Sequence, residues 1–111
     1  MKHFKNYEKI KLNIGGVKYD LLVADTHQKQ ILGLSNIHYL PARIGMIFIY
    51  DDLDYRTFTM EKTNIKLKII FLDENYEIVN IKTGYPRQKQ GVKSSEKCKY
   101  VIEIPVWFIS I

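Results

Sequence analysis

Apolar and polar residues alternate near the start of the chain as they do in a half-buried strand. Every second residue from Ile10 to Ile14 is apolar, and the residues between them are polar. Another extended run covers residues 17–24, and Gly15-Gly16 separates the two runs. A two-residue hairpin turn needs positive φ angles, which glycine adopts without a steric penalty. The pattern therefore predicts two antiparallel strands joined by a tight turn at Gly15-Gly16.

A short helix is predicted directly after this hairpin. Asp25 can cap its first turn, since a carboxylate accepts hydrogen bonds from the free N–H groups there. Helical spacing would turn Ile31 and Leu32 toward the core, and Gly33 can end the helix in the left-handed region. We therefore expect a helix over residues 26–32 that packs on the sheet through Ile31 and Leu32.

Short apolar runs separated by polar turns follow this helix. They predict strands over residues 46–50, 56–60, 66–72, 76–82 and 99–104. Asp51, Asp52 and Asp54 come after the first of these strands and predict an acidic turn. Asn75 tolerates the left-handed conformation that a turn between two later strands needs. Pro105 is expected to interrupt pairing at the end of the last strand.

The core is expected where apolar residues of these strands share a face. The residues assigned to it are Met46, Phe48, Phe58, Met60, Leu67, Ile69 and Phe71. Residues 84–97 are rich in Gly, Pro and charge and predict the longest loop. Since no repeat or linker interrupts the pattern, we expect residues 1–111 to form a single domain. About seven short strands and one short helix predict a mainly β (α+β) fold, a compact antiparallel domain that is barrel-like or sandwich-like.

Composition narrows the class of protein. Hydrophobic residues make up 46% of the chain, which is more than a disordered segment contains. Cys98 is the one cysteine, so a disulfide framework within the chain is excluded. The first residues lack the apolar run of a signal peptide, and no run approaches the ~20 apolar residues of a membrane span. We therefore expect a protein that does not enter a membrane and that stays in the cytoplasm or is assembled into a particle from it.

The formal net charge is +5, and lysine supplies most of the positive charge. Lys62, Lys66 and Lys68 lie close together in the sequence, with Phe58 and Phe71 nearby. Proteins that bind single-stranded nucleic acid combine such charge with exposed aromatic rings. The two phenylalanines fit the core better, and no arginine joins the group. Nucleic acid is therefore disfavoured as a partner.

Candidate reactive groups have simpler structural interpretations. His3, His27 and His38 lack the paired spacing of metal ligands. Cys98 is flanked by lysines that point away from it along a strand, which favours a buried structural thiol over a nucleophile. The acidic residues 51–54 lack the ligand and glycine pattern of a calcium loop. We therefore assign no catalytic or metal-binding residue and expect no cofactor.

Several short motifs occur in an order that resembles a known family. They are Ala24-Asp25-Thr26, Gly33-Leu34, Leu40-Pro41, Gly45-Met46-Ile47-Phe48, the spaced residues Phe58, Met60, Thr63, Ile65, Leu67 and Ile69-Ile70-Phe71, and Tyr100-Val101-Ile102-Glu103-Ile104-Pro105. On these motifs the chain resembles the family called domain of unknown function 192, over residues 17–108. The resemblance implies a compact β-rich fold and no agreed activity. The family includes bacterial, archaeal and phage proteins.

The polar positions of the family's central motif differ in this chain. That motif usually reads Phe-Trp-Met-Lys-Asn-Thr, followed by Ile-Pro-Leu-Asp. Here Thr59, Glu61 and Lys62 replace its Trp, Lys and Asn. Lys66 and Lys68 replace the later Pro and Asp, whereas the apolar positions are kept. A family function carried by those polar residues is therefore expected to be absent here.

The apolar C-terminal segment motivates the leading functional hypothesis, because such a segment is costly to expose. We expect a non-enzymatic structural or protein-interaction module, a small subunit of a larger assembly such as a phage virion component, with other protein chains as its partners. An apolar centre and a basic rim are expected at its interface. The candidate residues are Trp107, Phe108, Ile109, Ile111, Lys2, Phe4 and Lys5.

Two alternatives stay open. Trp107 can instead plug the open end of the protein's own barrel, because tryptophan is often buried. The chain can also be a small ligand-binding protein or a hydrolase with its site at the barrel mouth. A pocket lined by several convergent polar side chains would favour this second alternative.

Overall fold

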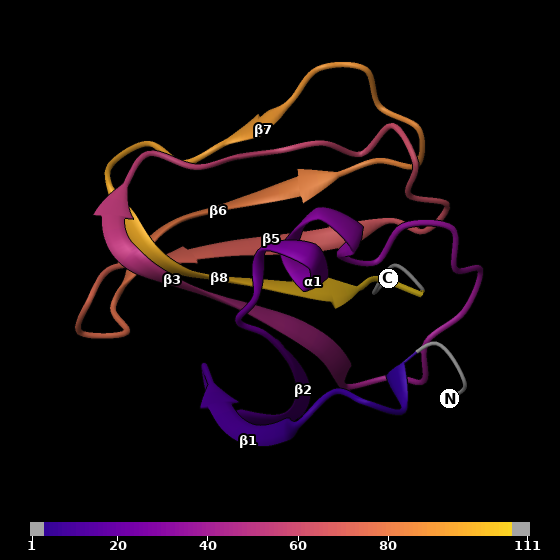
Figure 1. Ribbon diagram of the computed structural model, residues 1–111, viewed down its shortest axis with the longest axis horizontal. Coiled ribbons are helices and arrows are strands. Elements are labelled where there is room, and N and C mark those ends of the chain that lie inside the picture. The colour runs from indigo at the N-terminus through magenta and orange to yellow at the C-terminus, as the bar shows by residue number, and fades with distance from the viewer. Residues whose placement is uncertain (1–3, 108–111) are drawn as a thin grey trace.

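The protein is a two-sheet, sandwich-like domain in a computed structural model that describes residues 4–107 (Figure 1). The larger sheet has the strand order β1-β2-β3-β8-β5-β6. Its strands are β1 (Lys9–Ile14), β2 (Val17–Ala24), β3 (Ile44–Asp54), β5 (Leu67–Leu72), β6 (Ile78–Gly84) and β8 (Cys98–Pro105). The smaller sheet pairs β4 (Thr57–Phe58) with β7 (Val92–Lys93), and the helix is α1 (His27–Leu32). The predicted mainly β fold class is confirmed, in its sandwich-like form.

The chain begins with the predicted hairpin and then departs from a purely antiparallel plan. β1 and β2 are antiparallel, and Gly15 and Gly16 between them have φ angles of 59° and 85°. β2 and β3 are parallel, with Asp20 opposite Ile44. A parallel pair needs a crossover connection, which α1 and the loop after it provide. The prediction of a purely antiparallel sheet is therefore wrong for this one pair. The connection through α1 brings the chain back to the end of the sheet where β2 begins, so β3 runs in the same direction as β2.

Strand β8 lies at the centre of the larger sheet and is buried along nearly its whole length. It pairs with β3 on one side and with β5 on the other. Side chains of successive residues face opposite sides of the sheet, and each side has its own apolar cluster. One cluster packs beneath α1 and the smaller sheet, and the other packs against Leu12, Ile14 and Tyr19 of the first hairpin.

All seven residues predicted for the core belong to the cluster under α1 and the smaller sheet. Six of them are buried, and Phe58 is half-buried and packs against the others. Asn80 of β6 holds the smaller sheet in place, since its amide donates to the Lys93 carbonyl at 3.4 Å and its oxygen accepts from the Ser95 N–H at 3.1 Å. In Figure 1, α1 lies in front of β5 and β8, and β7 lies above β6, on the side away from β5.

Helix α1 forms where the sequence predicts it but packs differently. The Thr26 hydroxyl, and not the Asp25 carboxylate, accepts the capping bond from the Lys29 N–H at 3.2 Å. Ile31 and Leu32 are 67% and 59% exposed, so the prediction that they face the core is wrong. The helix has only six residues, and the buried anchors of this segment come from the residues after it. They are Leu34, Ile37 and Leu40.

Some strand limits also differ from the prediction. The acidic residues Asp51–Asp54 end β3 as exposed strand residues and do not form a turn. Tyr76, and not Asn75, adopts the positive φ angle of 63° in the turn before β6. β8 continues through Pro105, which pairs with Leu67, so the predicted interruption does not occur. No helix within residues 4–107 is long and apolar enough to span a membrane.

Candidate functional site

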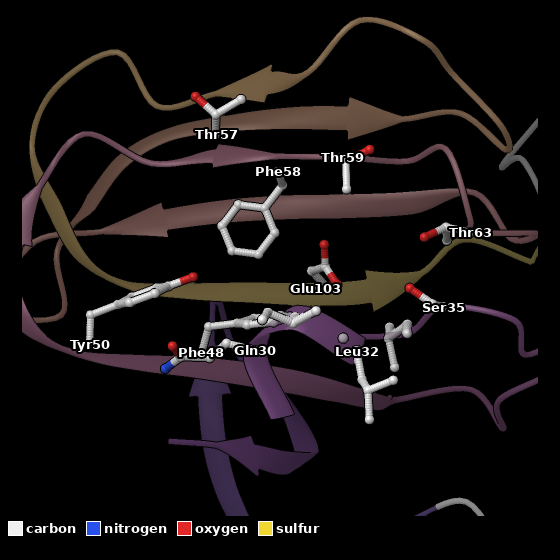
Figure 2. A pocket seen from close by; sticks show the side chains of 13 residues that line it. Gln30, Leu32, Ser35, Phe48, Tyr50, Thr57, Phe58, Thr59, Thr63 and Glu103 are labelled. Atoms are coloured by element: carbon white, nitrogen blue, oxygen red, sulfur yellow. The ribbon is translucent and has the colours of Figure 1, made fainter. Parts of the chain in front are cut away.

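A cavity of about 260 Å³ lies between α1, β3, β8 and the segment that begins with β4 (Figure 2). Its lining combines an acid, an amide, several hydroxyls and aromatic rings. The polar lining residues are Gln30, Ser35, Tyr50, Thr57, Thr59, Thr63 and Glu103. Phe48, Phe58 and the helix end from Ile31 to Leu34 supply the apolar walls. Polar side chains from four separate segments therefore converge on one partly open cavity.

Glu103 is the most unusual group in this lining. It is 4% exposed and lies on β8, between Met46 of β3 and Ile69 of β5. Figure 2 shows its carboxyl pointing from the strand into the ring of lining side chains. Within residues 4–107 no side chain pairs with this carboxyl through an ion pair or a hydrogen bond. Its oxygens are not sealed off completely, since no fully buried side-chain oxygen of these residues lacks a hydrogen-bond partner. Burial raises the pKa of Glu103 to about 8, because the charged form loses its water without gaining a partner.

The other polar groups of the cavity are mainly hydrogen-bond acceptors or hydroxyls. Both bonds from the Gln30 amide nitrogen go to backbone carbonyls, of Ala24 at 3.2 Å and Ile49 at 2.8 Å. This arrangement leaves the Gln30 side-chain oxygen as an acceptor. Burial raises the pKa of Tyr50 to about 12, so its phenol keeps its proton at neutral pH. Thr63 is buried at the cavity wall.

Two phenylalanines shape the apolar side of the cavity. The rings of Phe48 and Phe58 meet edge to face, with their centroids 4.8 Å apart. Gly33 ends α1 with a φ angle of 48°, and a Cβ on it would lie 3.4 Å from the Phe48 ring. Glycine at this position therefore allows the C-terminal end of α1 to lie directly against the Phe48 ring, because glycine tolerates the positive φ and adds no side chain.

Arg56 is a cation beside the cavity, because it stacks on the lining residue Tyr50, and other groups already bind it. Its guanidinium stacks 3.9 Å from the centre of the Tyr50 ring. It also donates to the Asp52 carboxylate at 2.8 Å and to the Cys98 carbonyl at 3.2 Å. The hydrogen bond from Arg56 lowers the pKa of Asp52. Arg56 therefore fixes the Tyr50 wall of the cavity and does not neutralise Glu103.

The cavity has two chemical states, which differ in whether Glu103 carries its proton. With its proton, Glu103 can donate a hydrogen bond to a ligand oxygen. Without its proton, it can accept a cation or several N–H groups, in a site where water screens the charge poorly. The lining contains no lysine, arginine or histidine.

The residues considered as reactive groups in the sequence do not line this cavity. His27 and His38 are exposed, and His3 lies outside the described residues. No group of three metal-ligating side chains occurs within residues 4–107. Cys98 is buried, and burial is the main cause that raises the pKa of its thiol. A thiol held in this protonated form matches the expected structural role.

The lysines considered for nucleic-acid binding do not gather around exposed phenylalanines. Phe71 is buried and Phe58 faces the cavity. Lys66 instead lies 5.3 Å from the centre of the Tyr85 ring.

The predicted interface is divided among different environments. Trp107 is 37% exposed and stacks on Tyr39, with ring centroids 5.2 Å apart. Phe4 is buried in the core, whereas Lys5 is exposed. The remaining candidates, Lys2, Phe108, Ile109 and Ile111, lie outside the described residues. The interface therefore stays a prediction.

Glu103 is the functional candidate that the sequence reasoning missed. A signal was present, because this acid interrupts an apolar strand, Tyr100 to Ile104. Acids are almost never fully buried unless they are paired or used. A lone acid among the apolar residues of a predicted strand therefore marks a candidate site.

Comparisons with known proteins agree with the sequence resemblance. Two solved structures share the fold: a protein of unknown function from Novosphingobium aromaticivorans and a protein from Sinorhizobium meliloti provisionally described as a transcription regulator. The first is 25% identical with a TM-score of 0.78, and the match covers 89% of this chain and 73% of that one. The second is 23% identical with a TM-score of 0.77, and the match covers 89% and 81%.

No curated protein matches the chain. The family model described as "Uncharacterized ACR, COG1430", which is DUF192, matches residues 10–110. That match spans nearly the whole chain, including α1, β8 and every side chain of the cavity. The chain therefore belongs to the DUF192 family.

Proposed function

We propose that this protein is a small ligand-binding protein whose ligand occupies the cavity around Glu103. The observation that carries the proposal is the carboxyl of Glu103, a residue that is 4% exposed and faces the partly open cavity without a partner in the described chain. A buried carboxyl in that state costs free energy unless something else compensates for it. A ligand that bonds to it supplies that compensation.

The composition of the cavity supports the same function. Ligand sites combine apolar and aromatic walls with a few convergent polar groups. Here Phe48 and Phe58 form the wall, while Glu103, Thr63 and Ser35 approach from three different segments. The volume of about 260 Å³ lies near the lower end of ligand pockets, which hold roughly 300–1,000 Å³. The ligand is therefore a small molecule and not a polymer.

A fragment screen by NMR tests this function. Amide and methyl signals of the protein are recorded with a panel of small alcohols, amides, amines and carboxylates. We expect at least one class of fragment to shift signals of Thr63, Glu103 and Phe58 together. Failure of every fragment to shift these signals would contradict the proposal.

Two tryptophan variants locate the binding. Thr59→Trp places a large ring at the cavity lining, because Thr59 is an exposed residue of that lining. Thr83→Trp adds the same ring on β6, away from the cavity, at an exposed position. We expect Thr59→Trp to abolish the fragment shifts and Thr83→Trp to leave them. Both variants are first checked for an unchanged unfolding temperature, so that loss of binding is not loss of the fold.

A protein-interaction module is a second candidate, and the exposed pair of Tyr39 and Trp107 favours it. Exposed, stacked aromatic rings are typical of residues that anchor protein partners. Trp107→Ala is expected to weaken association with a partner chain while thermal stability stays unchanged. Lost stability with unchanged association would instead assign Trp107 to the protein's own packing.

A further inference from the structure

We propose that the ligand of the cavity is a compact organic cation whose ammonium group pairs with the Glu103 carboxylate. This inference rests on the proposed ligand-binding function and adds the chemical class of the ligand. It follows from three features of the described residues: the charges of the lining, its hydrogen-bonding groups and the charge of the adjoining surface.

The charges of the lining favour a cation. Glu103 is the one carboxylic acid among the lining residues, and no basic side chain accompanies it. The guanidinium of Arg56, which stacks on the lining residue Tyr50, is also bound to Asp52 and Cys98. An anionic ligand would bring a second negative group next to Glu103, whereas a cation supplies the missing partner. Among anionic, neutral and cationic ligands, a cation is therefore the one whose charge complements the Glu103 carboxylate.

The hydrogen-bonding groups of the lining also favour a cation. Gln30 offers only its oxygen, since its N–H groups are bound to two carbonyls. Glu103 in its charged form offers two more acceptor oxygens. The hydroxyl oxygens of Ser35 and Thr63 can also accept. An ammonium group brings three N–H donors, which match this excess of acceptors, and an apolar body attached to it can contact Phe48 and Phe58.

The adjoining surface is acidic although the whole chain carries a net charge of +5. A second hollow, lined by residues of α1 and β3 and by Asp25, shares Gln30 and Tyr50 with the cavity. Asp25 and Asp51 line this hollow, and neither forms an ion pair within the described residues. Carboxylates at this position attract cations toward the cavity and repel anions.

Binding of an ammonium ligand is coupled to a proton. At neutral pH the Glu103 carboxyl carries a proton, because its pKa lies at about 8. When the ammonium enters, the O–H bond of Glu103 breaks, the proton leaves to the buffer, and the carboxylate pairs with the ligand. Affinity is therefore expected to rise about tenfold per pH unit below pH 8 and to level off above it.

The other titratable groups around the cavity do not produce this slope. Tyr50 on β3 keeps its proton, since its pKa is raised to about 12. Asp25, Asp51 and Asp52 line the adjoining hollow as exposed residues, and the hydrogen bond from Arg56 lowers the pKa of Asp52. His27 lines the same hollow, so His27→Asn is included as a control that keeps the slope.

Three aromatic probes of similar size and different charge test the inference. They are benzylammonium, benzyl alcohol and benzoate, and each is titrated into the full chain by calorimetry in two buffers of different ionisation enthalpy. We expect benzylammonium to bind at least about tenfold more tightly than the other two and to release nearly one proton at pH 7. Glu103→Gln should abolish this preference and the proton release, and the exposed control Glu96→Gln should keep both.

The outcomes distinguish failure of the cationic-ligand inference from failure of the ligand-binding function. Equal or tighter binding of benzyl alcohol or benzoate overturns the cationic ligand but leaves a ligand-binding cavity. Binding of benzylammonium without proton release, or with the same affinity in Glu103→Gln, also overturns it, because Glu103 is then not the partner. If none of the three probes and no fragment of the wider screen shifts the cavity signals, the ligand-binding function itself is wrong.

Discussion

Replacing Glu103 by glutamine is expected to remove most of the pH dependence of this protein's stability between pH 4.5 and 8. Glutamine has nearly the shape of the protonated acid but no proton to lose. The folded protein holds Glu103 in its neutral form, since the carboxyl is buried and unpaired within the described chain. The unfolded chain returns it to water, where it ionises at its ordinary pKa of 4.5.

The sign and size of the effect follow from these two pKa values. The folded-state pKa is the higher one, so the native protein binds one more proton than the unfolded chain between pH 4.5 and about 8. Stability is therefore complete below pH 4.5 and is lost as the pH rises through about 8. The difference between the two pKa values corresponds to roughly 5 kcal/mol at 1.36 kcal/mol per unit.

The assay is urea unfolding at a series of pH values from 5 to 9, for the wild type, Glu103→Gln and Glu96→Gln. We expect the wild type and Glu103→Gln to be about equally stable at pH 5. By pH 8.5 the variant should be more stable by roughly 3–5 kcal/mol. Glu96 is exposed, so Glu96→Gln should follow the wild type at every pH.

Comparing the variant with the wild type cancels the other titrating groups. The pKa of the Cys98 thiol is raised by burial, which lowers stability at alkaline pH in both proteins alike. The pKa of Asp52 is lowered by Arg56, which affects only acidic pH. If the two stability curves run parallel from pH 5 to 9, Glu103 is not a buried neutral acid and the argument for its role is wrong.

Four further substitutions test the core packing and the helix cap around the site. Ile69→Ala should destabilise the protein by about 2–5 kcal/mol in urea unfolding, because Ile69 is fully buried beside Glu103; a loss below about 1 kcal/mol would contradict its place in the core. Thr26→Ala should lower stability by about 0.5–2 kcal/mol through loss of the helix cap. Asp25→Ala should leave stability unchanged, and the reverse result would show that Asp25 is the cap. Gly45→Ala should be strongly destabilising, since a Cβ at Gly45 would overlap the Glu103 carbonyl oxygen; a variant with a wild-type unfolding temperature would show that β3 and β8 are less closely packed than described.

Residue patterns predicted the strands well, because local alternation and turn chemistry determine them. The Gly15-Gly16 hairpin and the apolar face of Met46 and Phe48 follow from spacing alone. The helix orientation was harder to predict. Ile31 and Leu32 fit an inward face by periodicity, yet Leu34 and the following loop occupy the space over the sheet. Which apolar residue fills a given space depends on tertiary packing, which a local pattern does not contain.

The cavity was less predictable than the strands. Its lining residues come from α1, β3, the β4 segment and β8, which are far apart in the sequence. Only Glu103 carried a local signal, as an acid inside an apolar strand. The hydroxyls of Ser35 and Thr63 look like ordinary loop residues until the fold brings them to the same space.

The central position of β8 has a consequence for biosynthesis. This strand follows all the others in the chain, yet it joins β3 to β5. While the ribosome still holds β8, the β1–β2–β3 unit and the β5–β6 hairpin each present an unpaired edge with exposed backbone groups. Such edges readily pair with other chains. The nascent protein is therefore most prone to aggregation just before β8 emerges, and the insertion of β8 both closes the sheet and delivers Glu103 to the cavity.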